Sequence, residues 1–173
     1  MDWKCVVNLE NLEFETREFN TRETRGLKYE IAPTACAESI GAKKLGFNVG
    51  TIKPGEFSCP YHFHYSEEEL FIILEGKAML RMNDNYREVK KGDMVFCSAT
   101  PEGAHQFYNH TNEVCKYFAL SNKNDEFEVA EYPDSKKIMV RKVKKVFETK
   151  SEVDYYKGEE NLAAFWPKEF LRK

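Results

Sequence analysis

The sequence lacks long apolar runs. No window of its 173 residues approaches the length that an apolar helix needs to cross a bilayer, and acidic residues interrupt the apolar positions near the N-terminus. These absences argue against a membrane-spanning helix. We therefore expect a cytoplasmic protein.

Cysteine is sparse and follows no pattern. The five cysteines, an odd number, lie far apart, and no two of them form a CxxC pair. This distribution argues against a disulfide framework and against a zinc site made of thiolates, because both need paired or closely spaced cysteines. We expect reduced thiols, most of them packed in the interior.

The chain also lacks a strong charge of either sign. Its 26 basic and 29 acidic residues give a formal net charge of −3 and are spread along most of the chain, so no basic field would attract nucleic acid. Hydrophobic residues make up 42% of the chain and aromatic residues 14%, which excludes low-complexity disorder as its main character. The length and composition predict one globular domain that could bind a small molecule.

Residues 45–121 contain short apolar or alternating runs separated by turn residues, a pattern typical of an antiparallel all-β domain. The runs cover residues 45–52, 59–65, 69–74, 77–82, 86–89, 94–99, 104–109 and 114–121. They predict seven or eight strands. Because no helix separates them, we expect a closed barrel or jelly roll rather than a parallel α/β sheet.

The flanks of this region are less clearly patterned. We expect residues 1–44 to form an N-terminal extension, with a strand-like VVNLENLEF, that packs on the barrel or on a partner subunit. Residues 122–173 form a predicted C-terminal extension with one further strand at KKIMVRKV. The segment NLAAFWPKEFLRK could start a short helix that Pro167 interrupts.

Histidine is scarce, with four in the whole chain, yet two of the four lie two residues apart. His62 and His64 fall in one predicted strand, where residues i and i+2 point to the same face with Cα atoms about 6.5 to 7 Å apart. Two imidazoles at this spacing can bind one ion at about 2.0 to 2.1 Å per nitrogen. A strand that begins at Glu69 would direct its carboxylate to the histidine side, whereas Glu68 would point away.

His105 follows a turn at residues 101–103 and would complete the ligand set. Three imidazoles and one carboxylate suit a divalent Mn, Fe, Ni, Co or Zn ion, and spacing does not choose among them. If the ion prefers six ligands, two positions are left for water or substrate. Each part also has a simpler interpretation, since an HxH pair is a weak motif, a lone histidine is more often core or surface, and three glutamates in a row are usually solvated. Only the combination predicts a metal site.

At these residues the chain resembles the cupin superfamily. The segment GEFSCPYHFHYSEEELFIILEG is similar to the first cupin motif, whose positions are taken by Gly55, His62, His64, Glu69 and Gly76. Six residues follow Gly55 where the family usually has five. The six residues between Glu69 and Gly76 select Glu69 among the three neighbouring glutamates.

The segment GDMVFCSATPEGAHQFYN resembles the second cupin motif, with Gly92, Pro101, Gly103, His105 and Asn109 in order. Two spacers depart from the usual pattern. Eight residues precede Pro101 where five are usual, and one residue rather than two separates Gly103 from His105. The geometry of this turn is therefore less well predicted than the ligand itself.

The resemblance covers residues 55–109 closely and residues 45–121 as a barrel. It implies an all-β double-stranded β-helix, the cupin jelly-roll barrel, and one divalent transition metal. The implied ligands are His62, His64, Glu69 and His105. The flanks are similar to single-domain bacterial cupins of the cupin_2 type, an uncharacterised group sometimes described as sugar-phosphate isomerase-like.

Strand alternation places four more side chains on the face of the ligands, where they could line a pocket. These are Phe71, Ile73, Phe107 and Asn109. The two phenylalanines and the isoleucine are equally typical of plain barrel core.

Three other residues near the motifs predict no chemistry. Cys59 and Cys97 flank the motifs without the pattern of a nucleophile, and parity puts Cys59 opposite to His62, so we interpret both as packing residues. His110 has the opposite parity to His105, which predicts an exposed side chain.

The predicted metal fits more than one function. The chain could be an enzyme that acts on a small polar metabolite, either isomerase-like or dioxygenase-like. A sugar phosphate would need a basic clamp, for which Lys53, Arg81 and Lys116 are available in the sequence. The alternatives are a non-catalytic metal-dependent sensor or binding protein and a metal that serves only as a structural staple.

Related single-domain cupins are usually dimers, and the resemblance therefore implies a homodimer. The aromatic residues of the C-terminal segment, Phe165, Trp166 and Phe170, could contribute to such an interface or could cap their own barrel.

Overall fold

The computed structural model describes residues 5, 8, 36–123, 128–150 and 152–172. Most of the predicted N-terminal extension, including nearly all of its strand-like segment, lies outside these residues. No helix in the described part of the chain is long and apolar enough to cross a membrane.

The described residues form eleven strands, one short α-helix and three short 3₁₀ turns. In chain order they are α1 (Cys36–Ser39), β1 (Leu45–Ile52), β2 (Phe63–His64), β3 (Glu69–Glu75), β4 (Lys77–Met82), β5 (Asn85–Lys90), β6 (Met94–Cys97), η2 (Pro101–Gly103), β7 (His105–Tyr108), β8 (Cys115–Asn122), β9 (Val129–Tyr132), β10 (Lys137–Val140), β11 (Lys145–Glu148), η3 (Leu162–Phe165) and η4 (Lys168–Phe170). Most strands match a predicted run to within two residues. The run at 59–65 is the exception, because only Phe63 and His64 form a regular strand.

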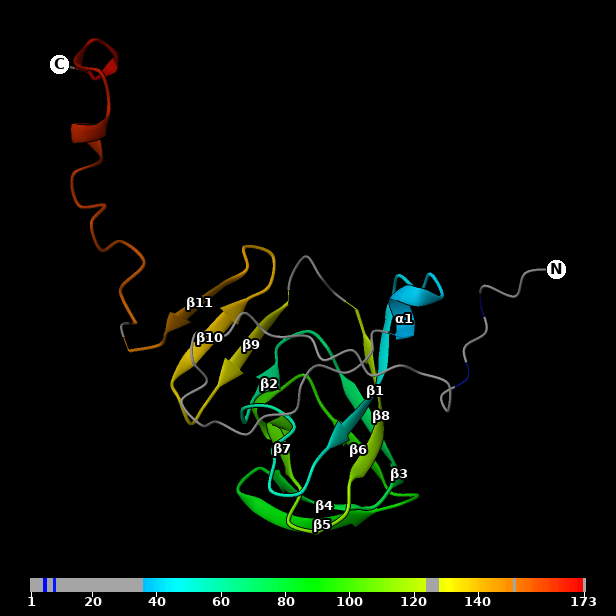
Figure 1. The fold of residues 1–173 in the computed structure, drawn as a ribbon. Helices are drawn as coiled ribbons and strands as arrows, with labels where there is room; N and C mark the ends of the chain where they lie inside the picture. The colour runs from blue at the N-terminus through cyan, green and yellow to red at the C-terminus, as the bar shows by residue number, and fades with distance from the viewer. Residues whose placement is uncertain (1–4, 6–7, 9–35, 124–127, 151, 173) are drawn as a thin grey trace.

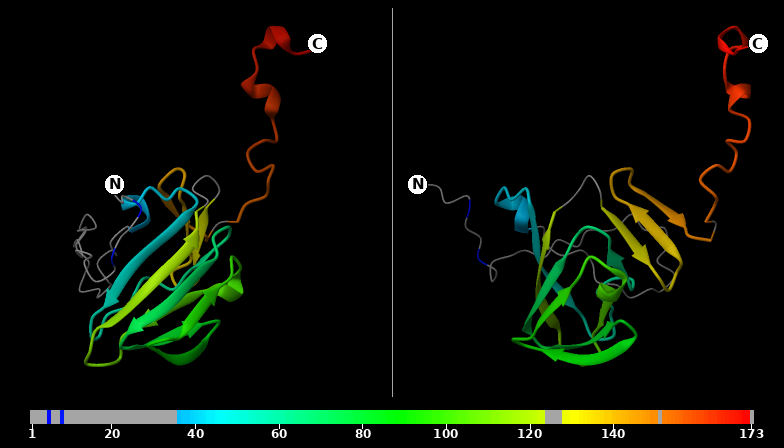
Figure 2. Two further views of the ribbon diagram at one scale, coloured as in Figure 1. Left: turned by 90° about the vertical axis from the view of Figure 1, so that its right-hand side faces the viewer. Right: turned by 180° about the vertical axis from the view of Figure 1, so that it is seen from behind.

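The strands form an antiparallel all-β barrel. One sheet has the order β1-β8-β3-β6, and the others have the orders β5-β4-β7 and β11-β10-β9-β2. An isolated bridge between His62 and His105 joins the last two sheets at β2 and β7. The joined sheets lie opposite the first and enclose a common interior (Figures 1 and 2), which confirms the predicted jelly-roll fold.

The turns explain why the strands pair in this register. Asn83 and Asp84 both adopt positive φ angles, 47° and 56°, between β4 and β5. This is the geometry of a two-residue hairpin turn, and Asn and Asp tolerate it better than most residues. Gly76 has φ 68°, and a Cβ there would lie 2.4 Å from the Val114 carbonyl oxygen, so only glycine fits between β3 and β4.

The interior is filled mainly by large apolar side chains. A cluster of buried residues includes Phe71, Ile73, Phe107 and Tyr117, whose side chains meet from both sides of the barrel. The Phe71 ring centroid lies 5.1 Å from that of Phe107 and 5.7 Å from that of Tyr117. These contacts form a rigid floor beneath the histidines, since Phe71 also lies 5.1 Å from the His105 ring.

The region after residue 121 contributes to the barrel as well as extending it. β9 pairs with β2 through Phe63↔Glu131 and His64↔Ala130, and β10 and β11 continue the same sheet outward. The predicted barrel, residues 45–121, therefore leaves out β9, although β9 pairs with the strand that contains the predicted ligand His64.

Residues 152–172 extend away from the barrel (Figures 1 and 2). They contain the two 3₁₀ turns η3 and η4, one on each side of Pro167, where the sequence predicted an interrupted short helix. The aromatic residues Phe165, Trp166 and Phe170 are 61% to 76% exposed there, so in the structure they do not cap the barrel.

Candidate metal centre

The four predicted ligands come together inside the barrel. His62 precedes β2, His64 ends it and His105 begins β7, while Glu69 begins β3 in the opposite sheet. Reciprocal backbone hydrogen bonds fix His62 against His105, at 3.3 Å from His62 N to His105 O and 2.9 Å in the other direction. Glu68 is exposed, as strand alternation predicted.

Each of the three imidazoles directs its Nδ1 atom at a fixed acceptor. His62 Nδ1 lies 2.9 Å from the Pro60 carbonyl oxygen. His64 Nδ1 lies 2.7 Å from the Glu128 carboxylate, and His105 Nδ1 lies 3.0 Å from the Gly103 carbonyl oxygen. A neutral imidazole carries one proton, and a carbonyl or carboxylate oxygen can only accept it. When the rings are neutral, these contacts therefore place the proton on Nδ1 and leave each Nε2 with a free lone pair.

These three Nε2 atoms converge with one carboxylate oxygen. His62 Nε2 lies 3.1 Å from His64 Nε2, and Glu69 Oε2 lies 3.4 Å from His64 Nε2 and 3.3 Å from His105 Nε2. Glu69 Oε2 and His105 Nε2 are both buried, and neither has a hydrogen-bond partner among the described residues. Buried polar atoms without partners are costly, so this arrangement calls for a ligand that all four atoms can share.

Burial shifts the pKa values of His64, Glu69 and His105. Desolvation, reinforced by the neighbouring His62, lowers the pKa of His64 to about 4 and that of His105 to about 3. Desolvation raises the pKa of Glu69 to about 7, partly opposed by His62. The two buried imidazoles are therefore neutral, the state in which histidine binds a metal.

The donor set and its spacing fit a divalent transition metal. Atoms bound to one ion at about 2.1 Å lie about 3.0 Å apart in an octahedron and about 3.4 Å apart in a tetrahedron. The three observed separations, 3.1, 3.3 and 3.4 Å, fall in this range. His62, Glu69 and His105 also have ligand atoms within 4.8 Å of one another. Nitrogen and oxygen donors without sulfur suit Mn, Fe, Ni, Co or Zn.

No local sequence pattern marks Glu128, which lies just before β9. Its side chain is fully buried, and its two carboxylate oxygens accept hydrogen bonds from His64 Nδ1 at 2.7 Å and from the Ser66 hydroxyl at 2.6 Å. Because β9 pairs with β2 at Ala130↔His64, alternate residues of β9 face the histidines. Only knowledge of this pairing, across 64 residues of sequence, could have identified Glu128.

A second acidic residue, Glu67, is buried behind His64 and paired with Arg141. Both guanidinium NH groups donate to this carboxylate, one of them at 2.8 Å. His64, Glu67 and Glu128 therefore form a compact acidic group. Since Arg141 neutralises Glu67, and His64 and Ser66 occupy Glu128, we interpret this group as the support of the site and not as a second metal site.

Two further side chains lie beside His62. The Tyr132 ring stacks on the His62 ring at 5.7 Å, and Cys59 Sγ lies 3.6 Å from His62 Nδ1. Strand parity predicts that Cys59 points opposite to His62. That argument does not apply, because residues 59–62 are not part of a regular strand.

The four predicted pocket-lining residues are all buried. Phe71, Ile73 and Phe107 belong to the core cluster, and the two phenylalanines also contact His105. Asn109 is fully buried, and its amide donates to the Ile52 and Glu113 carbonyl oxygens, both at 2.7 Å. Asn109 therefore fixes the loop after β7.

Cys97 is buried and His110 is exposed, as the sequence predicted. Cys97 is buried beside Glu69 in the β3–β6 register, and burial raises the pKa of its thiol, so it stays protonated. His110 is exposed and contacts Glu88 at 3.1 Å.

None of the three basic residues considered for a phosphate clamp faces the site. Arg81 pairs with Asp134 through contacts of 2.6 and 3.0 Å and stacks on Tyr61. Lys116 pairs with Glu75 at 3.7 Å, and Lys53 is exposed.

Comparisons with known proteins agree with this architecture. Residues 48–121 match the family described as Cupin domain. An uncharacterised protein of Methanocaldococcus jannaschii is 35% identical over 60 residues, and one of Aquifex aeolicus is 32% identical over 59 residues. These alignments cover 35% and 34% of this chain and 46% of each relative, so the chain spans less than half the length of the curated relatives it matches.

Two solved structures share the fold over most of the chain. A protein from Acidithiobacillus ferrooxidans, proposed to be a sugar phosphate isomerase, aligns with a TM-score of 0.66 at 23% identity and covers 72% of this chain and 80% of its own. The sugar phosphate isomerase of Silicibacter pomeroyi, from the cupin superfamily, aligns with a TM-score of 0.63 at 19% identity and covers 73% and 80%. At these identities the likeness concerns the fold alone. The family match and the observed barrel together identify residues 48–121 as a cupin domain.

Proposed function

We propose that this cupin domain binds one divalent transition metal through His62, His64, Glu69 and His105. The observation that carries the proposal is the 3.1 Å separation of His62 Nε2 and His64 Nε2. Both rings direct their Nδ1 protons at other acceptors, so the two Nε2 lone pairs face each other and cannot form a hydrogen bond. A shared cation converts this repulsive contact into an attractive one.

We further propose that the metal serves an enzyme that acts on a small polar metabolite, in an isomerase-like or a dioxygenase-like reaction. A divalent metal in such a site supplies Lewis acidity, which polarises a substrate oxygen or activates a bound water. The chain's own residues keep His64 and His105 neutral, orient the three imidazoles through Glu128 and the two carbonyl oxygens, and shield one side of the site with the Phe71 floor. The sugar phosphate isomerase named above supports the isomerase class only through the shared fold.

The alternative is a non-catalytic metal-dependent sensor or binding protein. Both functions need the same metal and the same ligand, and they differ in whether the bound molecule is chemically changed. Mass spectrometry of a ligand recovered from the loaded protein distinguishes them, because only the enzyme returns a product.

The metal proposal is tested by elemental analysis of protein purified without a metal-affinity tag. We expect about one transition metal per chain in the wild type and a large loss in His62→Ala, which removes one Nε2 donor from a partly exposed position. The matched control is His110→Ala, the one histidine that lies outside the site. A wild type that cannot be loaded, or a His62→Ala variant with full metal content, would contradict the proposal.

We also propose a homodimer that forms through the outer face of the β1-β8-β3-β6 sheet. Two apolar rows cross all four strands on this face. Phe47, Leu120, Leu70 and Phe96 form one row, and Phe118, Ile72 and Met94 form the other, which ends at Val49, a residue already buried within the chain. Phe96 is 56% and Met94 is 64% exposed, which leaves an apolar edge suited to a self-complementary contact.

We also propose that the protein is cytoplasmic. The five cysteines are all free, as reducing conditions would keep them.

A further inference from the structure

One face of the β11-β10-β9-β2 sheet begins at the metal ligands and continues outward to solvent. Directly opposite residues of paired strands share a face, and the register of this sheet gives two rows on the histidine side. One row consists of His64, Ala130, Met139 and Val146, and the other consists of Tyr132, Lys137 and Glu148. Because β10 and β11 extend to one side of the barrel (Figures 1 and 2), the two rows form a shelf beside the site.

The shelf meets the metal ligands through direct contacts. The Tyr132 ring stacks on the His62 ring, with centroids 5.7 Å apart, and the Tyr132 hydroxyl donates to Met139 Sδ at 3.9 Å. His62 is half-buried, whereas the other two histidines of the site are 8% and 1% exposed, so His62 is the imidazole that solvent reaches most easily. Along the shelf the exposure rises to 57% at Val146. A molecule that lies on the shelf can therefore reach the metal ligands beside His62.

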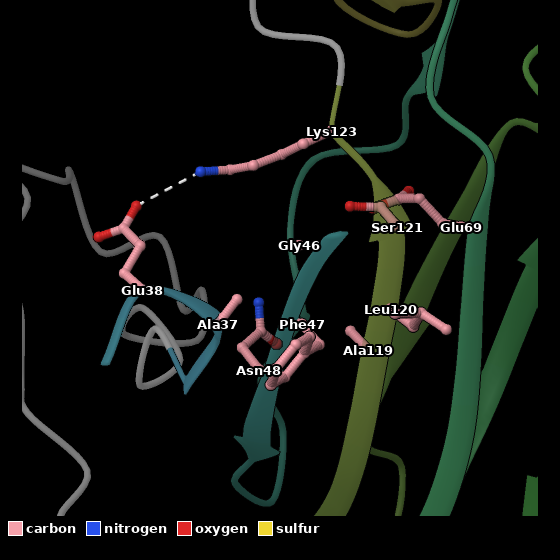
Figure 3. A pocket seen from close by; sticks show the side chains of 10 residues that line it. All are labelled: Ala37, Glu38, Gly46, Phe47, Asn48, Glu69, Ala119, Leu120, Ser121 and Lys123. Carbon is pink, nitrogen blue, oxygen red and sulfur yellow. Dashed lines mark ion pairs between the residues drawn. The ribbon is translucent and has the colours of Figure 1, made fainter. Parts of the chain in front are cut away.

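A separate cavity lies beside Glu69. It has a volume of about 180 Å³ and opens between β1, β8 and α1, where Lys123 pairs with Glu38 at 3.6 Å (Figure 3). None of the three histidines of the site lines this cavity. The shelf, in contrast, includes His64 and contacts His62, so it is the better place for a molecule that binds the metal.

Lys137 supplies the positive charge of the shelf. Its Nζ lies 5.6 Å from the centre of the Tyr132 ring, within the range of a cation–π contact. Its cross-strand neighbour Glu148 pairs with Lys150 at 3.4 Å, and Lys137 forms no ion pair within the part of the chain that the structure describes. An ammonium group on a four-carbon stem can turn toward an anion. Unlike the three basic residues considered above, Lys137 is therefore placed to bind an anionic group beside the metal centre.

Charge and spacing describe the molecule that fits here. Three neutral imidazoles and one carboxylate around a divalent ion leave a net charge of about +1, and Lys137 adds a second positive charge. The backbones of β2 and β10 are two strand spacings apart, about 10 Å, with β9 between them. A molecule that contacts both the ion and Lys137 therefore has two polar ends joined by a short carbon chain, which would lie along Tyr132 and Met139.

We propose that Lys137 binds an anionic group, a carboxylate or a phosphate, at one end of a small molecule whose other end binds the metal through oxygen. The inference rests on the proposed metal site, and it adds a charge and a length to the small polar metabolite proposed above. Lys137 is then a specificity-determining residue, which favours molecules with an anionic far end over molecules of similar length without one.

The test uses full-length protein loaded with Mn(II), whose metal content is measured first. Isothermal titration compares succinate with butyrate, two four-carbon acids that differ by one carboxylate, and glycerol 3-phosphate with glycerol. We expect the anionic member of at least one pair to bind about tenfold or more tightly, the effect of one hydrogen bond between charged groups. The pair that shows this preference identifies the anionic group as a carboxylate or a phosphate.

Lys137→Met keeps most of the length of the side chain and removes its charge. We expect this variant to retain metal and to lose the preference, whereas Lys137→Arg, which keeps the charge, should retain at least part of it. The matched control is Lys145→Met, which removes an exposed lysine from β11. Lys145 lies opposite Val140, on the other face of the same sheet, so this variant should bind all four molecules as the wild type does.

The outcomes separate the two proposals. A wild type that cannot be loaded contradicts the proposed function before any small molecule is added. A loaded wild type without a preference in either pair overturns the inference, and so does a loaded Lys137→Met variant that keeps the wild-type preference. Complete loss of the preference in Lys137→Arg, or its loss in Lys145→Met, also overturns it, because the effect would then not depend on a positive charge at Lys137.

Discussion

Glu128 accepts the Nδ1 proton of His64 at 2.7 Å from a position fully inside the protein. This contact fixes the tautomer and the ring orientation of His64, and the Ser66 hydroxyl holds the second carboxylate oxygen. Carboxylates that orient a metal-binding histidine in this way also increase its basicity. Glu128 is therefore a positioning residue, which acts on the metal through His64.

We predict that Glu128→Ala lowers metal affinity about 10- to 100-fold, the usual effect of losing such a partner. The readout is competition with a chromogenic chelator at fixed pH. Glu131→Gln is the matched control, because Glu131 is a neighbouring acid of β9 that contacts Tyr65 and not the histidines. Glu128→Gln, whose amide oxygen can still accept from His64, should recover part of the affinity, whereas a role in folding alone would leave the affinity of the folded variants unchanged.

Metal binding should release a proton from Glu69 at mildly acidic pH. The pKa of Glu69 is raised to about 7 by burial, so at pH 6 the metal-free carboxyl is mostly protonated and must lose its proton to bind the ion, while at pH 8 it is already ionised. His64 and His105, with pKa values lowered to about 4 and 3, are neutral at both pH values and contribute no proton. The apparent affinity should therefore fall as pH decreases below 7.

The measurement is calorimetric titration of metal in buffers with different ionisation enthalpies, which gives the number of protons released. We expect more protons released at pH 6 than at pH 8, and a smaller difference between the two pH values in Glu69→Gln. Equal release by wild type and Glu69→Gln at pH 6 would show that Glu69 is not a ligand or is already ionised.

The ion pair between Arg141 and Glu67 supports the site through folding stability. Glu67 has a side-chain exposure of 4%, while that of Arg141 is 31%. We predict that Arg141→Met lowers the free energy of unfolding by about 3 kcal/mol, because it leaves a buried carboxylate without its partner. Urea denaturation of the metal-free protein measures this loss. The double variant with Glu67→Gln should be more stable than Arg141→Met alone, and a double variant that is less stable would contradict this explanation.

Much of this fold and site follows from local patterns in the sequence. β1 and β4 have the predicted bounds because alternation and turn residues act within a few positions. The choice of Glu69 over Glu68 rests on the same parity, and the structure places Glu69 with the histidines. Cys59 shows where parity fails, since residues outside a regular strand do not alternate.

Features that depend on long-range pairing were not predictable. Glu128 and Tyr132 face the histidines because β9 pairs with β2, and no local pattern in the sequence specifies that partner. A cavity between β1, β8 and α1 depends on Gly46, Asn48 and Ala119 lying in neighbouring rows of β1 and β8. Strand alternation pointed to large side chains on the ligand face, whereas a cavity forms where facing side chains are small.

The outer face of the β1-β8-β3-β6 sheet presents an apolar edge at β6. Phe96 lies beside Leu70, and Met94 beside Ile72, at the β6 edge of the two apolar rows. A charge placed there would have to be buried without a partner in a dimer that uses this face, so Phe96→Lys should shift the protein from dimer to monomer. Its exposure of 56% means that the substitution should cost the monomer little stability.

Light scattering coupled to size-exclusion chromatography measures the mass of both proteins. The control is Tyr86→Lys, on an exposed strand of the β5-β4-β7 sheet, which should leave the mass unchanged. If the wild type is monomeric, the dimer proposal is wrong. If the wild type and Phe96→Lys are both dimeric, the dimer forms through another surface, and the exposed aromatic residues of the C-terminal segment become the first candidates.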